Sequence, residues 1–311
     1  MKKILSLLLA FTLVVSVVGC GKKTPTDPKE ILKTTQENAK NTKSVEGKMT
    51  MDLDATMEVG GEKQDFKTTI TADIATFTDP MKSKVTMTMD LSALGAGTQE
   101  ITSYVAKDGD DYYTYTGVAG QWNKVKLEKD AIENAMKQAN SESYVELYNK
   151  NAENFTNKGE VDLDGKKVIQ LEGKISGASI KELIEESGVL DQEQFSTYKS
   201  MVTPFFEGLS DTPVKMYVDS ETMNTSKMTV DLKDVLQGVF DKAMEQYGSL
   251  LTGGADTEMK FTLNKCDISM TYSNYNKAAD FEIPEEAKNA KEIDATDMQD
   301  ITAATDGAIG E

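Results

Sequence analysis

Apolar and polar residues alternate along a long stretch near the start of the chain. Between Val45 and Val59 every second position is apolar or glycine, and the positions between them are polar or charged. Side chains of a β-strand point alternately to opposite faces, so this pattern predicts a long strand with one dry face. The dry face contains Met49, Met51, Leu53 and Met57.

Two more stretches continue the same alternation. Gly60-Gly61 predicts a turn after the first strand, and Asp79-Pro80 predicts another before the third. Three consecutive amphipathic strands predict an antiparallel meander, whose dry face needs a covering layer. That face contains Ile70 and Ile74 in the second strand, and Val85, Met87 and Met89 in the third.

Further hairpins follow. Turns are predicted at residues 108–110, 162–166 and 219–221, and Met216 and Met228 lie in the strands that flank the last of these. A final strand from Met259 to Tyr272 includes Met270. Its apolar residues change parity near Asn264-Lys265, which predicts a β-bulge there.

Helical segments separate the strands. Asp27-Pro28 predicts a capped helix start, and that helix is expected to run to about Thr42. Apolar spacing of three and four from Leu232 predicts an amphipathic helix that ends before Gly248. The predicted fold class is α+β, with a curved antiparallel sheet whose dry face is covered by helices. Other helix-compatible segments are 127–140, 143–151, 179–187 and 191–209.

The composition excludes many kinds of catalytic site. The chain contains no histidine and no arginine, and its 34 basic residues are all lysine. Histidine triads, histidine-based zinc sites and arginine-assisted phosphoryl transfer are therefore excluded. The acidic turns at residues 108–110 and 162–166 lack the ligand spacing of a calcium loop. We therefore expect no cofactor, no metal and no catalytic residue.

The net charge and the cysteine content limit which molecules the chain can bind and which disulfides it can form. The formal net charge is −18, and it becomes −20 if Lys2 and Lys3 are removed with the leader described below. Such acidity argues against binding to nucleic acid or to anionic lipid. With Cys20 modified, Cys266 has no cysteine partner in the chain and is expected to be a small core residue.

The first twenty residues have the pattern of an export signal. Lys2 and Lys3 precede an apolar run from Ile4 to Val18, which is too short for a membrane-spanning helix and is followed by Gly19-Cys20. This arrangement resembles the lipobox of bacterial lipoproteins, in which the cysteine is acylated and becomes the first mature residue. The alternative is an ordinary secretory peptide with an incidental cysteine.

These observations predict one folded domain behind a lipid anchor. Residues 1–19 form the signal peptide, 20–29 a lipidated tether, 30–287 a single α+β domain and 288–311 a flexible acidic tail. We expect Cys20 to tether the protein to the lipid bilayer, on the extracytoplasmic face of the bacterial cell membrane.

The order of these features resembles one known group of proteins. After the lipobox come one helix, the meander, the covering helices, the segment from Pro213 to Asp219 and the closing residues 272–286. This order is similar to that of LolA-like lipoproteins, which include Gram-positive lipoproteins akin to the LppX and LprG group. The resemblance implies an incomplete β-barrel wrapped over helices. In several members the resulting cavity carries lipids or lipoproteins.

The methionines suggest what the dry face does. Flexible, polarizable thioethers are over-used at adaptable binding surfaces. We therefore expect an apolar cavity for a lipid or acyl chain, lined by Met49, Met51, Leu53, Met57, Ile70, Ile74, Val85, Met87, Met89, Met216, Met228 and Met270. The alternatives are a surface interaction protein with a filled core and a protein partner, and an enzyme that uses only Asp, Glu, Lys, Ser or Tyr.

Overall fold

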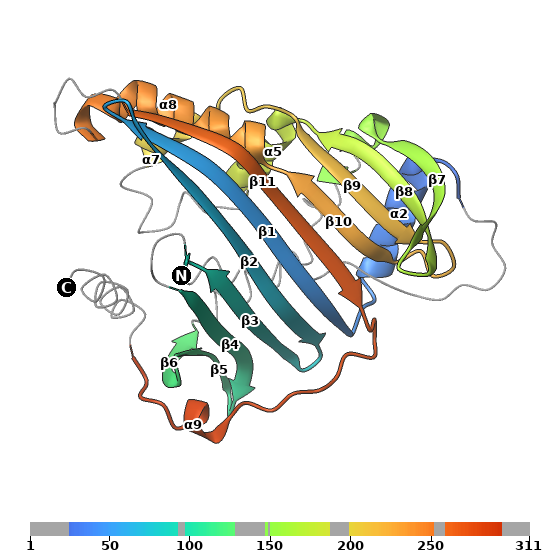
Figure 1. Cartoon of the computed structure of the whole chain (residues 1–311). Helices are drawn as coiled ribbons and strands as arrows, with labels where there is room; N and C mark the ends of the chain where they lie inside the picture. Colours follow the sequence, from blue (N-terminus) through green and yellow to red (C-terminus); the bar gives the residue numbers. More distant parts are fainter. Residues whose placement is uncertain are drawn as a thin grey trace.

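The described part of the protein forms one open antiparallel sheet with helices against it. The computed structural model describes residues 25–92, 97–127, 147–148, 150–186, 199–251 and 259–293. Eleven strands lie in the order β6-β5-β4-β3-β2-β1-β11-β10-β9-β8-β7 (Figure 1), and every adjacent pair is antiparallel. Their bounds are β1 Ser44–Val59, β2 Glu62–Thr78, β3 Met81–Asp90, β4 Thr98–Asp108, β5 Asp111–Val118, β6 Gln121–Leu127, β7 Thr156–Leu163, β8 Lys166–Ile175, β9 Thr212–Asp219, β10 Thr225–Asp231 and β11 Met259–Ser273.

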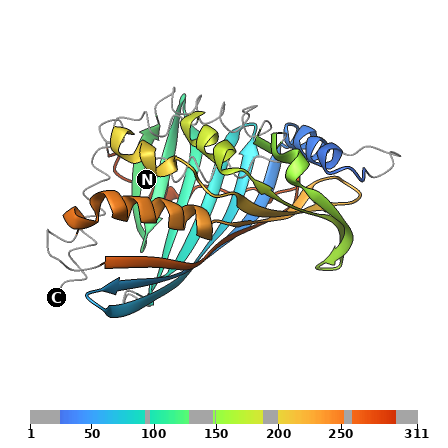
Figure 2. The same ribbon diagram turned by 90° about the horizontal axis from the view of Figure 1, so that it is seen from above.

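Apart from α9, the helices lie on one side of the sheet, which we call the concave face (Figures 1 and 2). The opposite face is called the outer face. The expected fold class, a curved and unclosed antiparallel sheet with helices against it, is confirmed. The described helical elements are α2 Pro28–Ala39, η2 Ala152–Asn154, α5 Gly177–Glu186, α7 Lys199–Val202, η4 Thr203–Phe206, α8 Lys233–Leu251 and α9 Glu285–Lys288.

Local sequence signals explain most element ends. Asp27 caps α2 by accepting a hydrogen bond from the Lys29 amide (2.9 Å), and Pro28 occupies the first turn. Gly60 and Gly61 have φ values of 59° and 89°, which suits the two-residue turn between β1 and β2. The same left-handed conformation at Asp164-Gly165 joins β7 to β8.

The predicted bulge in the last strand is confirmed. Asp54 pairs with Lys265, but the next residue, Ala55, pairs with Leu263, so Asn264 is the extra residue. The bulge keeps Leu263 and Cys266 on the concave face, where both are buried with Ala55. Burial in this apolar cluster raises the pKa of the Cys266 thiol, as expected of a small core residue.

Some predicted helix bounds were wrong. The first helix ends at Ala39 rather than near Thr42, and α8 continues through Gly248 to Leu251. The α8 helix continues because a glycine inside a helix costs only about 1 kcal/mol relative to alanine and does not by itself end it. Leu127 is the last residue of β6 rather than the start of a helix. The rest of the helix predicted there, most of 143–151 and residues 187–198 lie outside the described residues.

The C-terminal segment does not leave the fold where a tail was expected. Residues 274–293 cross the outer face beside β2 to β6 (Figure 1), and Ala287 is fully buried. The Ile293 amide donates to the Lys124 carbonyl of β6 (2.9 Å). The folded region therefore includes residues 288–293. The remaining tail residues lie outside the described part.

Candidate functional site

The predicted dry-face methionines form a row across the sheet. Pairing in register runs from Met87 to Ala72, Met49, Met270, Met228 and Met216, on strands β3, β2, β1, β11, β10 and β9. Residues directly opposite each other in antiparallel strands project to the same face. The concave face thus contains a continuous line of residues, five of them thioethers, which we call the methionine row.

Two parallel rows flank it. One contains Met89, Ile70, Met51 and Ile268, and the other contains Val85, Ile74, Gly47 and Tyr272. The structure therefore brings ten of the twelve predicted lining residues into three adjacent rows. The other two, Leu53 and Met57, lie farther along β1 toward its turn.

Burial divides the methionine row into two halves. Met216, Met228 and Met270 are buried, whereas Met49 and Met87 are only partly buried. Of the other predicted residues, Ile74 and Val85 are buried, Met51, Leu53, Ile70 and Met89 are partly buried, and Met57 is 42% exposed. The half on β1 to β3 therefore keeps thioether surface within reach of solvent.

Met216 and Met228 of the buried half pack against α2, whereas Met270 is buried in a second cluster with Val45 and Ala72. Ile31 and Leu32 of this helix share one apolar cluster with Met216 and Met228. The Tyr148 hydroxyl also donates to the Met228 sulfur (3.2 Å). These contacts make the β9–β11 half part of the protein core.

Two tyrosines that were not among the predicted site residues lie at the end of β11, beside the row that contains Gly47. Tyr272 lies opposite Gly47, and Tyr275 donates a hydrogen bond to the Thr225 carbonyl. Burial raises the pKa of both phenols, so both stay protonated at neutral pH. The glycine at an apolar-phase position of β1 was the available sequence signal, because it leaves space for a large residue on the next strand.

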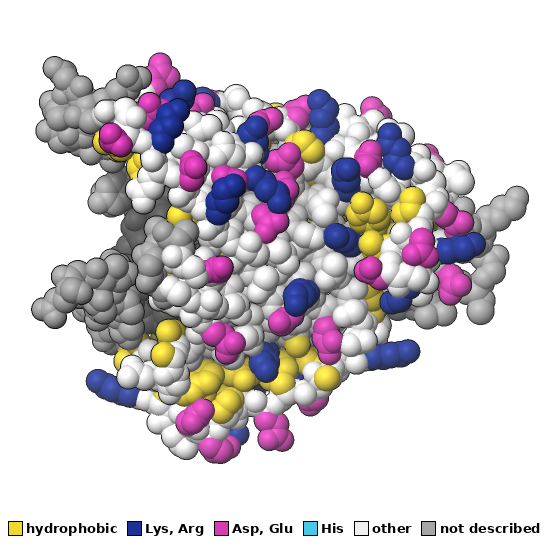
Figure 3. Space-filling model, in the orientation of Figure 1, with side chains coloured by type: hydrophobic (Ala, Val, Ile, Leu, Met, Phe, Trp, Pro, Cys, Tyr) yellow, Lys and Arg dark blue, Asp and Glu magenta, His cyan; other side chains and the backbone are white. Residues whose placement is uncertain are grey.

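Apart from Glu62, which pairs with Val59 at the β1–β2 turn, the charged residues of the central strands lie on the outer face (Figure 3). Asp52 and Lys265 pair across β1 and β11 (2.8 Å), and this hydrogen bond holds the pKa of the Asp52 carboxyl below its ordinary value. Lys67 does the same for Asp54 (2.7 Å). None of the residues in the three rows is charged, so this surface suits an uncharged apolar group.

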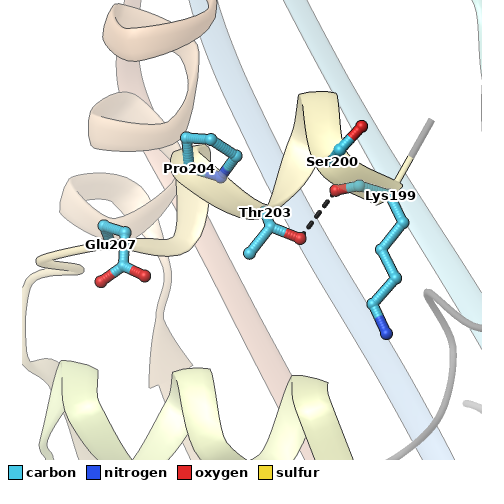
Figure 4. Close-up of a pocket in the computed structure, with 5 residues that line it drawn as sticks. All are labelled: Lys199, Ser200, Thr203, Pro204 and Glu207. Carbon is cyan, nitrogen blue, oxygen red and sulfur yellow. Dashed lines mark hydrogen bonds between the residues drawn. The ribbon is translucent and has the colours of Figure 1, made fainter.

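A separate open pocket of about 620 Å³ lies beside α7 and η4 (Figure 4). Thr203 Oγ1 donates to the Lys199 carbonyl (2.7 Å), and Glu207 pairs with Lys181 of α5 (2.8 Å). Its lining includes none of the twelve predicted residues. The lining residues are Lys199, Ser200, Thr203, Pro204 and Glu207.

The described residues contain neither a candidate metal site nor a candidate membrane-spanning helix. They contain no group of three or more cysteine, aspartate or glutamate residues placed to hold a metal ion. Among them, no helix is long and apolar enough to cross a membrane. Cys20 lies outside the described residues.

Comparison with known proteins identifies the family. Residues 27–292 match a family of unknown function, DUF6612. The chain belongs to this family. No curated protein matches it.

Solved structures that the chain is similar to include two mycobacterial proteins. LprF from Mycobacterium bovis is 13% identical with a TM-score of 0.46, over 86% of this chain and 100% of that one. The Mycobacterium tuberculosis lipoprotein LppX is 12% identical with a TM-score of 0.38, over 82% and 98% of the two chains. A DUF1329 family protein from Desulfovibrio piger is 10% identical with a TM-score of 0.22, over 84% and 96%.

Proposed function

We propose that this DUF6612 protein is a membrane-tethered extracytoplasmic lipoprotein that holds an apolar ligand, a lipid or acyl chain, against the concave face of β1 to β3. The observation that carries the proposal is the incomplete burial of Met49 and Met87 in a row whose other three methionines are buried. Solvent-accessible thioethers on a concave, uncharged surface are suited to bind flexible chains of varied shape.

The anchor part of the proposal rests on the leader and on where the chain enters the fold. Acylation of Cys20 would place the body on the bilayer, and two or more acyl chains are needed for stable anchoring. The Asn157 side chain donates to the Thr26 carbonyl (2.9 Å), so the predicted tether meets the folded domain at β7, an edge strand of the sheet. The ligand-binding half, on β1 to β3, lies on the other side of β11.

A second function is favoured by the other half of the row. Met216, Met228 and Met270 are core residues, and if the β1–β3 half were also filled, the protein would be a surface interaction module with a protein partner. Volume available over Met49 and Met87 decides between the two functions.

Saturable uptake of an anthroyloxy-labelled fatty acid by the full-length Cys20→Ser chain, which carries no acyl anchor, tests the proposal. We expect uptake with a fixed stoichiometry and a rise in the unfolding midpoint with ligand concentration, because the ligand binds only the folded state. Met87→Trp should then abolish uptake with little loss of stability. In a filled core the same overpacking should cost about 1–3 kcal/mol. Absence of uptake together with that cost would support the interaction module.

A further inference from the structure

The apolar concave face is closed at one end of β1 and open at the other. At the start of the strand Val45 is 2% exposed and packs in one cluster with Tyr272 and Tyr275. At the turn end Met57 and Val59 are each 42% exposed. Large apolar side chains are often exposed singly, but these two project from the same face of one strand.

Helix α8 adds a third exposed apolar residue at this end. Phe240 is 41% exposed, and its ring lies 4.4 Å from that of Phe261, centroid to centroid. Phe261 is the β11 partner of Met57. Met57, Val59 and Phe240 therefore border one apolar surface, which we call the hairpin mouth.

Apolar side chains of β1 connect the hairpin mouth to the methionine row, through Ala55, which is 2% exposed. From Val59 to Met49 the concave-face residues of β1 are all apolar, and the rise of a strand makes this strip about 33 Å long. Its residues are Val59, Met57, Ala55, Leu53, Met51 and Met49.

Helix α8 forms a fixed wall along the strip. Leu232 and Leu236 pack on the cluster of Ala55 and Leu263, and Phe240 follows one turn later. The Gln237 side chain accepts from the Leu263 amide (2.6 Å) and donates to the Phe261 carbonyl (3.1 Å). The bulge at Asn264 and the hydrogen bonds of Gln237 hold the helix over β11, where Leu236 packs in one cluster with Ala55 of the strip.

We propose that the hairpin mouth is where an acyl chain first contacts the protein, and that Met57 and Phe240 guide it along β1 to the methionine row. The inference rests on the proposed function and adds a direction to it. The chain enters at the β1–β2 turn, and the end near Tyr272 and Tyr275 is the closed end.

Stopped-flow uptake of the anthroyloxy-labelled fatty acid by the Cys20→Ser chain tests this. Met57→Gln and Phe240→Gln should each slow association by about fivefold or more, because each removes apolar surface that the chain would bury first. The matched control is Met201→Gln on α7, which is 40% exposed and is not one of the strip residues. We expect its association rate to equal that of the parent.

Val118→Gln tests a competing entry route for the acyl chain. Val118 is 38% exposed on β5 and shares the methionine-row register through Ile101, so a chain that enters beside β4 and β5 would meet it first. Uptake slowed by Val118→Gln but not by Met57→Gln would overturn the inference and leave the proposed function standing. Equal slowing by Met201→Gln would also overturn it. Failure of the parent chain to take up the probe would refute the proposed function itself.

Discussion

The stability lost on truncating each of two facing methionines distinguishes a filled core from a ligand-binding surface. Met270 on β11 and Met49 on β1 are direct partners in the methionine row, but Met270 is 1% exposed and Met49 is only partly buried. A methionine-to-alanine change at a fully buried site costs about 2–5 kcal/mol, from lost transfer free energy and from the cavity that remains. We expect Met270→Ala to fall in that range.

Met49→Ala should cost clearly less, about 1 kcal/mol. Part of its side chain is already in contact with solvent, and a truncated side chain beside an open space leaves no new enclosed cavity. Urea unfolding of the Cys20→Ser chain and its two double variants, followed by circular dichroism, measures both free energies of unfolding. An unchanged denaturant slope would show that the comparison concerns the folded state.

Addition of a fatty acid should then separate the variants further. Ligand stabilises the folded parent by mass action, and Met49→Ala should weaken that stabilisation whereas Met270→Ala should preserve it. Equal costs of 2–5 kcal/mol for both substitutions, with no effect of fatty acid, would refute the division of the row into two halves.

Three further outcomes are expected. Cys20→Ser should release the protein from membranes or leave its signal uncleaved, and membrane fractionation with normal processing and retention would contradict the anchor. Gly177→Ala should destabilise the protein by about 2 kcal/mol or more, since a Cβ there would lie 1.8 Å from the Leu209 carbonyl oxygen. Gly238→Ala in α8 would place a Cβ with nothing within 4 Å, and it should stabilise the protein by up to about 1 kcal/mol. Thermal unfolding measures both changes. Asp52→Asn should be nearly neutral at pH 7, where its exposed ion pair contributes little. Because the folded-state pKa of Asp52 is lowered, that contribution is present above its ordinary pKa of 3.8 and is lost as the pH falls further, so the difference from the parent should vanish in unfolding measured near pH 2.

The sequence could predict the strands because their pattern is local. The alternation from Val45 to Val59 and the parity change around Asn264 each depend on neighbouring residues, and both were confirmed. The alignment of Met49 with Met270 and Met87 could not be predicted in this way. It depends on the register between strands far apart in the chain, which turns and packing set together.

The same limit explains the C-terminal segment. Residues from Glu285 are short of large apolar groups, which is typical of a mobile tail. In the structure, Phe281 lies against Phe77 and Tyr104 (ring centroids 5.8 and 5.7 Å), and Glu286 accepts from the Trp122 indole (3.2 Å). Those partners belong to β2, β4 and β6, so no local pattern around residue 285 could indicate them.

The position of β11 between β1 and β10 has a consequence for the order of folding. Among the strands that the structure describes, those of residues 44–127 form one meander and those of residues 156–231 form another, and only β11, which follows both in the chain, joins them. Until Met259–Ser273 is available, β1 and β10 each present an unpaired edge, the kind of surface that recruits other chains. Such long-range pairing favours slow folding, so truncation before residue 259 should give one aggregation-prone chain with two separate half-sheets rather than a smaller stable sheet.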